Sequence, residues 1–82
     1  MSETKEIIVT ITFAGYLKHY TGHREPQTLV LPADSSAKAA IGQFEIPDRL
    51  IKVVLINGEK ADMDTTLQDG DAITLQPLLL GG

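Results

Sequence analysis

Residues 52–61 read KVVLINGEKA, and this stretch carries the clearest local structural pattern in the chain. Residues 53–56 form a short apolar run, and Asn57-Gly58 follows directly. Both central residues of a type I′ turn need a positive φ, which Asn and Gly tolerate best, so Asn-Gly is a preferred two-residue link between antiparallel strands. The stretch therefore predicts a β-hairpin that turns at Asn57-Gly58.

The hairpin is followed along the chain by a second turn and a last strand. Residues 62–71, DMDTTLQDGD, are rich in turn formers, and Asp69-Gly70 marks a second turn. Residues 72–77, AITLQP, alternate apolar and polar side chains, which places Ile73 and Leu75 on one face of a strand. Pro77 has no backbone N–H to donate, so we expect it to end this strand.

Two strands are predicted near the start of the chain. In residues 6–13, EIIVTITF, every second residue from Ile7 to Phe13 is apolar, and β-branched residues dominate. Residues 27–33, QTLVLPA, place Leu29 and Leu31 on one face. Because the two strands are close in sequence, we expect an antiparallel pair. A short helical turn around Tyr16 is expected between them.

The main helix is predicted in residues 34–47, DSSAKAAIGQFEIP. Asp34, Ser35 or Ser36 can cap its N-terminus, and Pro47 stops it. The apolar face follows at positions i, i+3, i+4 and i+7, which are Ala37, Ala40, Ile41 and Phe44.

One helix and one sheet each need a partner to bury their apolar faces, and the economical solution packs them against each other. The sequence therefore predicts an α+β domain spanning residues 1–82, with a mixed sheet of four to five strands on one main helix. By analogy, the first and last strands lie side by side in the middle, which is the β-grasp or ubiquitin-like arrangement. Residues from about 77 to 82 are expected to form a flexible Gly-Gly tail.

Composition excludes several classes of function. The 82 residues carry a net charge of −4, which argues against nucleic acid or an anionic membrane as a partner. The absence of cysteine excludes a disulfide framework and a cysteine nucleophile. The polar N-terminus is not a signal peptide, and no apolar run approaches the roughly 18 residues of a membrane span. A cytoplasmic protein is expected.

Two groups of residues resemble metal sites only superficially. His19 and His23 are four residues apart, but Gly22 interrupts any shared helical face and no third ligand follows. The four acids of residues 62–71 lack the Gly and Glu spacing of a calcium loop, so we expect solvated turn acids. We expect no metal, no cofactor bound by the chain itself and, without a nucleophile–base pair, no enzyme.

The last six residues, PLLLGG, invite two interpretations. Free termini are usually poorly ordered, which favours a frayed end without function. However, burying each leucine is worth about 1.5–3 kcal/mol, so three exposed leucines are costly. The residues alone leave open whether this segment is a frayed end or a functional tail.

Several motifs together resemble the MoaD/ThiS family of ubiquitin-like sulfur carriers, in particular the small subunit of molybdopterin synthase. The resemblance spans nearly the whole chain. The motifs are Phe13-Ala14 and Gly22 after the first strand, Asn57-Gly58, the L-x-D-G-D pattern of Leu67, Asp69, Gly70 and Asp71, then Pro77 and the terminal Gly81-Gly82. The chain departs from the molybdopterin subunit at Leu78, Leu79 and Leu80, where that subunit usually carries a second proline and two further residues.

The resemblance implies a carrier that acts with partner enzymes. An ATP-using activating enzyme of the E1 type would adenylate Gly82, and sulfur would then convert its carboxylate to a thiocarboxylate for a sulfur-accepting synthase subunit in molybdenum cofactor biosynthesis. Gly81 and Gly82 would fit a narrow channel because glycine has no Cβ. Pro77 and the leucines Leu78, Leu79 and Leu80 would contact the partner.

Other destinations stay open. The sulfur could serve thiamine or another cofactor, the tail could be joined to lysines as a protein tag, or the domain could be a β-grasp interaction module without carrier function. We also expect Ile8 and one or two of residues 53–56 on the outer sheet face with the tail leucines, where an exposed apolar patch would mark a docking surface.

Overall fold

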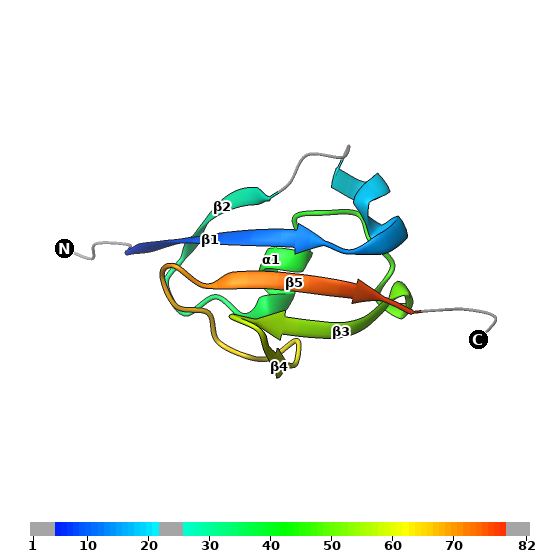
Figure 1. Ribbon diagram of the computed structural model, residues 1–82. Coiled ribbons are helices and arrows are strands. Elements are labelled where there is room, and N and C mark those ends of the chain that lie inside the picture. The colour runs from blue at the N-terminus through cyan, green and yellow to red at the C-terminus, as the bar shows by residue number, and fades with distance from the viewer. Residues whose placement is uncertain (1–4, 22–25, 79–82) are drawn as a thin grey trace.

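Five strands form one mixed sheet in the order β2-β1-β5-β3-β4 (Figure 1). The computed structural model describes residues 5–21 and 26–78. The strands are β1 (Glu6–Phe13), β2 (Gln27–Pro32), β3 (Ile51–Ile56), β4 (Glu59–Ala61) and β5 (Ala72–Pro77). β1 and β5 run parallel at the centre, and the other neighbouring pairs are antiparallel. The predicted β-grasp sheet, with the first and last strands side by side, is confirmed.

One short helix covers one face of this sheet and leaves the other face open (Figure 1). It is α1 (Ala37–Ile41). Two 3₁₀ helices are also present: η1 (Gly15–Thr21) follows β1, and η2 (Asp48–Leu50) precedes β3. The buried hydrophobic residues are Ile7, Val9, Ile11, Phe13, Leu17, Leu31, Ala37, Ala40, Ile41, Ile46, Val54, Leu67, Ile73 and Leu75. The predicted inward faces of the first and last strands are confirmed.

The turn between β3 and β4 has the predicted geometry. Asn57 has a φ of 54° and Gly58 a φ of 85°, so both central residues lie in the left-handed region that a type I′ turn requires. β4 pairs with β3 over three residues, from Ile56 opposite Glu59 to Val54 opposite Ala61. The hairpin predicted from residues 52–61 is confirmed.

The main helix is shorter than predicted, because it ends at Ile41 rather than continuing through Phe44. Gly42 still donates to Lys38 O at 2.8 Å, but Gln43 and Phe44 donate to residues three positions back, which tightens the chain into turns. Phe44 nevertheless packs inward: its ring lies 4.8 Å from that of Phe13, edge to face. The prediction was wrong about where the helix ends and right that Phe44 faces the core.

The backbone N–H groups at the start of α1 donate to another segment of the chain and not to the side chain of the N-cap residue. Ser36 occupies the N-cap position, but its side chain makes no capping hydrogen bond. Instead, Ala37 N–H donates to Thr65 O and Lys38 N–H donates to Met63 O, both at 2.9 Å. These carbonyls supply acceptors that a helix of five residues cannot provide for its first turn.

Within residues 5–21 and 26–78, no helix is long and apolar enough to cross a membrane.

Candidate functional site

The chain leaves the sheet after β5, and hydrogen bonds to two other segments fix this point, which we call the exit. Pro77 is the last residue of β5, as predicted, and is paired with Ile51 of β3. At the next residue, Leu78 N–H donates to Leu50 O at 2.8 Å, and Leu78 O accepts a hydrogen bond from the Tyr16 hydroxyl at 2.5 Å. Both polar backbone atoms of Leu78 are therefore engaged before the sequence continues for four residues to Gly82.

Tyr16 reaches this point because η1 packs against the end of β5. Ala14 N–H donates to Leu75 O at 2.9 Å, which ties the end of β1 to β5. Gly15 then turns the chain with a φ of 57°, and Leu17 anchors η1 with a fully buried side chain. Tyr16 stays 39% exposed at the surface above the exit. The helical turn predicted around Tyr16 is confirmed.

Gly15 also makes room for Pro77. A Cβ placed on Gly15 would lie 3.1 Å from Pro77 Cγ, which is closer than ordinary van der Waals contact. The positive φ and this close approach both favour glycine here. The loop after β1 and the last residue of β5 are therefore packed directly against each other at the exit.

Two of the predicted tail residues belong to the part of the chain that the structure describes, and four do not. Pro77 and Leu78 are described and half-buried. Leu79, Leu80, Gly81 and Gly82 lie outside the described residues, so their predicted roles in docking and activation stay predictions.

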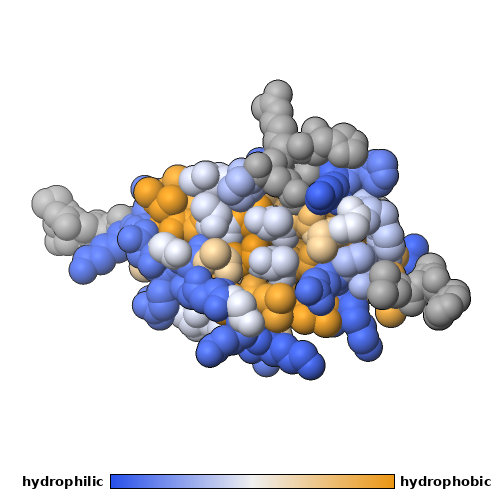
Figure 2. Space-filling model, viewed as in Figure 1, coloured by the Kyte–Doolittle hydropathy of each residue, from blue (hydrophilic) through white to orange (hydrophobic). Residues whose placement is uncertain are grey.

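The open face of the sheet carries an exposed apolar pair. Ile8 of β1 and Val30 of β2 are cross-strand partners, and their side chains are 52% and 57% exposed. Figure 2 looks onto this face, where orange and pale surface covers the middle and blue surface lies mostly toward the edges. The pale middle fits a threonine row, because Thr10 is paired with Thr28 and Thr12 with Thr74. The uncharged, partly apolar middle of this sheet face is suited to contact with another protein.

This pair lies at the other end of the sheet from the exit. Gly70 N–H, before the start of β5, donates to Ile8 O, whereas Phe13 is paired with Leu75 near the end of β5. Phe13 is five positions after Ile8 along the strand, which corresponds to about 16 Å at the usual rise. The predicted exposure of Ile8 is confirmed, but Leu78 does not lie beside it.

β3 contributes two side chains to the open face, which agrees with the prediction of one or two from residues 53–56. Val53 and Leu55 are half-buried, and Leu55 is paired with Thr74 on the open face. Val54, between them, is buried in the core with 6% exposure. β3 therefore adds two half-buried apolar side chains to this face, next to Lys60 of β4, which is paired with Leu55.

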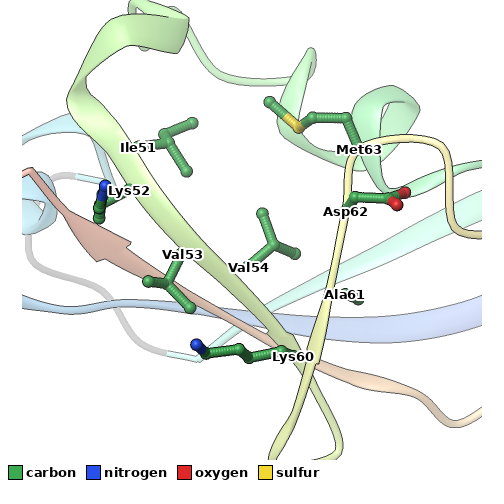
Figure 3. A pocket seen from close by; sticks show the side chains of 8 residues that line it. All are labelled: Ile51, Lys52, Val53, Val54, Lys60, Ala61, Asp62 and Met63. Atoms are coloured by element: carbon green, nitrogen blue, oxygen red, sulfur yellow. The ribbon is translucent and has the colours of Figure 1, made fainter.

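A hollow of about 350 Å³ lies at the outer edge of β3 (Figure 3). Ile51, Val54 and Met63 point toward one another in it. β4 ends opposite Val54, and the register of β3 against β5 shifts between Ile51 and Val53, which makes Lys52 a bulged residue. A bulge, a short edge strand and an edge lysine are the features that discourage pairing with another strand. The hollow therefore lies along an edge that is protected against pairing with another strand, and it is a poor candidate for the functional site.

The carboxylate of Asp71 is a feature that the sequence analysis missed. The four acids of residues 62–71 were predicted to be solvated, yet Asp71 is only 8% exposed. Its Oδ1 accepts from Asn57 Nδ2 at 2.9 Å and its Oδ2 accepts from Gln68 N–H at 2.8 Å. Asp71 is therefore a structural acceptor that joins two turns. The pattern L-x-D-G-D contains it but gives no sign of its burial.

Asp62 and Asp69 also accept backbone hydrogen bonds, Asp62 from its own turn and Asp69 from β1. Asp69 Oδ1 accepts from Ile8 N–H at 2.7 Å, and Asp62 Oδ1 accepts from Asp64 N–H at 2.9 Å. Across the described part of the chain, no three His, Asp or Glu side chains gather in a way that could hold a metal ion. His23 lies outside that part.

Comparisons with known proteins support the same fold. No curated protein matches the sequence. Among solved structures, the Haloferax volcanii HVO 2177 protein aligns over 100% of this chain and 92% of its own, with a TM-score of 0.79 and 20% identity. SAMP1 of Haloferax volcanii aligns over 92% and 99%, with a TM-score of 0.72 and 20% identity.

A third structure is a putative molybdopterin converting factor subunit 1 from Pyrococcus furiosus. It aligns over 89% of this chain and 99% of its own, with a TM-score of 0.70 and 17% identity. At these identities the likeness establishes the fold. Together with the match of a ubiquitin-like family model, it confirms the predicted ubiquitin-like fold. That model, described as Mut7-C ubiquitin, matches residues 6–79, and the chain therefore belongs to the Mut7-C ubiquitin family.

Proposed function

We propose that this chain is a ubiquitin-like carrier whose Gly82 carboxylate is activated by an ATP-using enzyme of the E1 type. The observation that carries the proposal is the exit at the end of β5, where Leu78 is hydrogen-bonded to both Leu50 and Tyr16. A fixed exit followed by a short segment ending in Gly81-Gly82 suits delivery of a carboxylate into another protein, because glycine passes through narrow space.

The chemistry proceeds in two balanced steps. A carboxylate oxygen of Gly82 attacks the α-phosphorus of ATP, and pyrophosphate leaves, which gives an acyl-adenylate. Hydrosulfide then attacks the carbonyl carbon, AMP leaves, and the product is a thiocarboxylate. The adenylate is needed because AMP is a far better leaving group than oxide. The carrier contributes the reactive end, and its partner enzymes contribute the catalytic groups.

The sulfur acceptor that we favour is the large subunit of a molybdopterin synthase. Support comes from the sequence motifs shared with the small subunit of that enzyme and from the fold shared with a putative molybdopterin converting factor subunit 1. A carrier for thiamine or another cofactor would use the same activation. These destinations differ only in the enzyme that receives the thiocarboxylate.

A second candidate function is conjugation to other proteins. The observation that favours it is the likeness to SAMP1, solved also as small archaeal modifier protein 1, which matches with a TM-score of 0.72. In that case a lysine amine, and not hydrosulfide, attacks the acyl-adenylate or an ester derived from it. The product is an isopeptide bond to Gly82.

The test is intact-mass spectrometry after incubation with ATP, an E1-type adenylating enzyme and sulfide. We expect a mass increase equal to the difference between sulfur and oxygen, confined to the C-terminal peptide. The matched control lacks Gly82 and should stay unmodified while retaining its fold. An unmodified full-length chain in the presence of active enzyme would exclude the carrier function, and an isopeptide-linked product would favour conjugation.

A further inference from the structure

The exit from β5 is held by residues that are distant in sequence. Tyr16 donates to Leu78 O across 62 residues of sequence, and Leu50, at the end of η2, accepts from Leu78 N–H. Leu78 belongs to no strand, yet both of its backbone polar atoms have partners. Two separate elements, η1 and η2, therefore converge on the residue that begins the tail.

The hydrogen bond from Tyr16 is not required to satisfy a buried group. Tyr16 is 39% exposed, so water can replace Leu78 as the partner of its hydroxyl. The buried anchor of η1 is the neighbouring Leu17, with 0% exposure. Loss of the Tyr16 hydroxyl should therefore leave the fold intact and change mainly the position of Leu78.

We propose that Tyr16 is a positioning residue that latches Leu78 and thereby sets the reach of the Gly82 carboxylate. The part of this inference that concerns reach rests on the proposed carrier function. With the latch closed, four residues extend beyond Leu78, which corresponds to about 14 Å at full extension. The receiving active site must lie within that distance of the exit.

Opening the latch releases Leu78 and so lengthens the segment that can extend from the sheet. Pro77 has no N–H and therefore donates no hydrogen bond to β3. The next backbone donor along the chain is Leu78 N–H, which donates to Leu50 O. When Leu78 detaches, Pro77 stays paired with Ile51 and packed against Gly15, so the five residues beyond Pro77 become available, or about 17 Å of reach. The latch therefore separates a state in which four residues can extend beyond the exit from one in which five can.

The latch itself is tested by amide hydrogen exchange on the isotope-labelled full chain. We expect Tyr16→Phe to accelerate exchange of the Leu78 amide by about 2- to 12-fold, the range for one net hydrogen bond, while core amides such as Ile73 keep their rates. The matched control is Tyr20→Phe, the same change at the other tyrosine of η1. Unchanged Leu78 exchange, or equal acceleration at Ile73, would overturn the proposal.

The effect on reach is tested with a shortened tail. ATP–pyrophosphate exchange is measured with the E1-type enzyme for the natural chain and for a chain lacking Leu79, each with and without Tyr16→Phe. Deletion of one residue shortens the latched tail by about 3.4 Å, so it should reduce kcat/KM strongly. With Tyr16→Phe, the same deletion should cost at least about twofold less, because the latch opens more easily.

The outcomes separate the two hypotheses. An equal cost of the Leu79 deletion in both backgrounds would show that Tyr16 does not set the reach. No pyrophosphate exchange with any variant would count against the carrier function, and the Leu78 amide would then decide the latch on its own. A structural role of Tyr16 would lower activity in both backgrounds alike and would not change the tolerance of tail length.

Discussion

The side-chain amide of Asn57 donates to the carboxylate of Asp71 at 2.9 Å, which ties the β3–β4 turn to the turn before β5. The same asparagine exchanges two further hydrogen bonds with Ala72: its N–H donates to Ala72 O at 2.8 Å and its Oδ1 accepts from Ala72 N–H at 3.0 Å. The start of β5 is therefore fixed by the side chain and the backbone of Asn57, as its end is fixed by the backbone of Leu78.

Asp71→Asn is expected to destabilise the fold by about 1–3 kcal/mol. An amide offers one oxygen where the carboxylate offers two, so either Asn57 or the Gln68 N–H loses its acceptor at a site that is largely shielded from water. The free energy of unfolding is measured by urea denaturation. The control Asp64→Asn changes an exposed side chain and should shift stability by less than about 0.5 kcal/mol. Equal effects at both positions would contradict a structural role for Asp71.

Gly15→Ala is expected to cost more stability than Gly58→Ala. Both glycines have a positive φ, which costs an alanine about 1–2 kcal/mol. At Gly58 a Cβ meets open space, whereas at Gly15 it lies 3.1 Å from Pro77 Cγ. The difference between the two urea midpoints therefore isolates the contact with Pro77. Matching losses would mean that the proline ring moves aside freely.

Gly42→Ala is expected to stabilise the protein by about 0.5–1 kcal/mol. Gly42 has right-handed helical angles, with φ −66° and ψ −11°, so alanine fits without backbone strain. The nearest atom to its Cβ is Lys38 O at 3.2 Å, which requires a small adjustment of an exposed turn. Thermal unfolding measures the effect, and a lower melting temperature would show that this contact outweighs the gain in helix propensity.

The double change Ile8→Thr and Val30→Thr tests the open sheet face as a docking surface for the activating enzyme. Both side chains are more than half exposed, so unfolding free energy should change by less than about 1 kcal/mol. If the enzyme covers this pair, lost burial of about 1.5–3 kcal/mol per side chain should raise KM at least tenfold in pyrophosphate exchange. The control Thr28→Ser alters the same exposed face modestly. An unchanged KM would place the enzyme on another surface.

Local sequence patterns were sufficient for the strands and the hairpin. Alternation from Ile7 to Phe13 predicted the buried face of β1, and Asn57-Gly58 predicted the turn, because both features depend on neighbouring residues. The length of α1 was not predictable in the same way. Ala37, Ala40, Ile41 and Phe44 have helical spacing, yet the backbone tightens after Gly42 and Phe44 still reaches Phe13. Periodicity records which residues face the core more reliably than where a helix ends.

The site depends on contacts between distant residues, which explains why only part of it was predicted. Pro77 marked the end of the last strand because its missing N–H is a local property. The hydrogen bond between Tyr16 and Leu78, and the burial of Asp71 beneath Asn57, arise from the way the sheet brings separate turns together. No residue type or spacing at Tyr16 distinguishes it from an ordinary surface tyrosine.

The central position of β5 has a mechanical consequence. The tail continues from a strand that is paired with β1 on one side and β3 on the other. A pulling force applied to the tail along the strand loads both ladders at once and in shear, so many hydrogen bonds must break together. Resistance to such a force is governed by the rate of forced unfolding. An enzyme or a protease can therefore pull on this end of the chain while the domain stays folded.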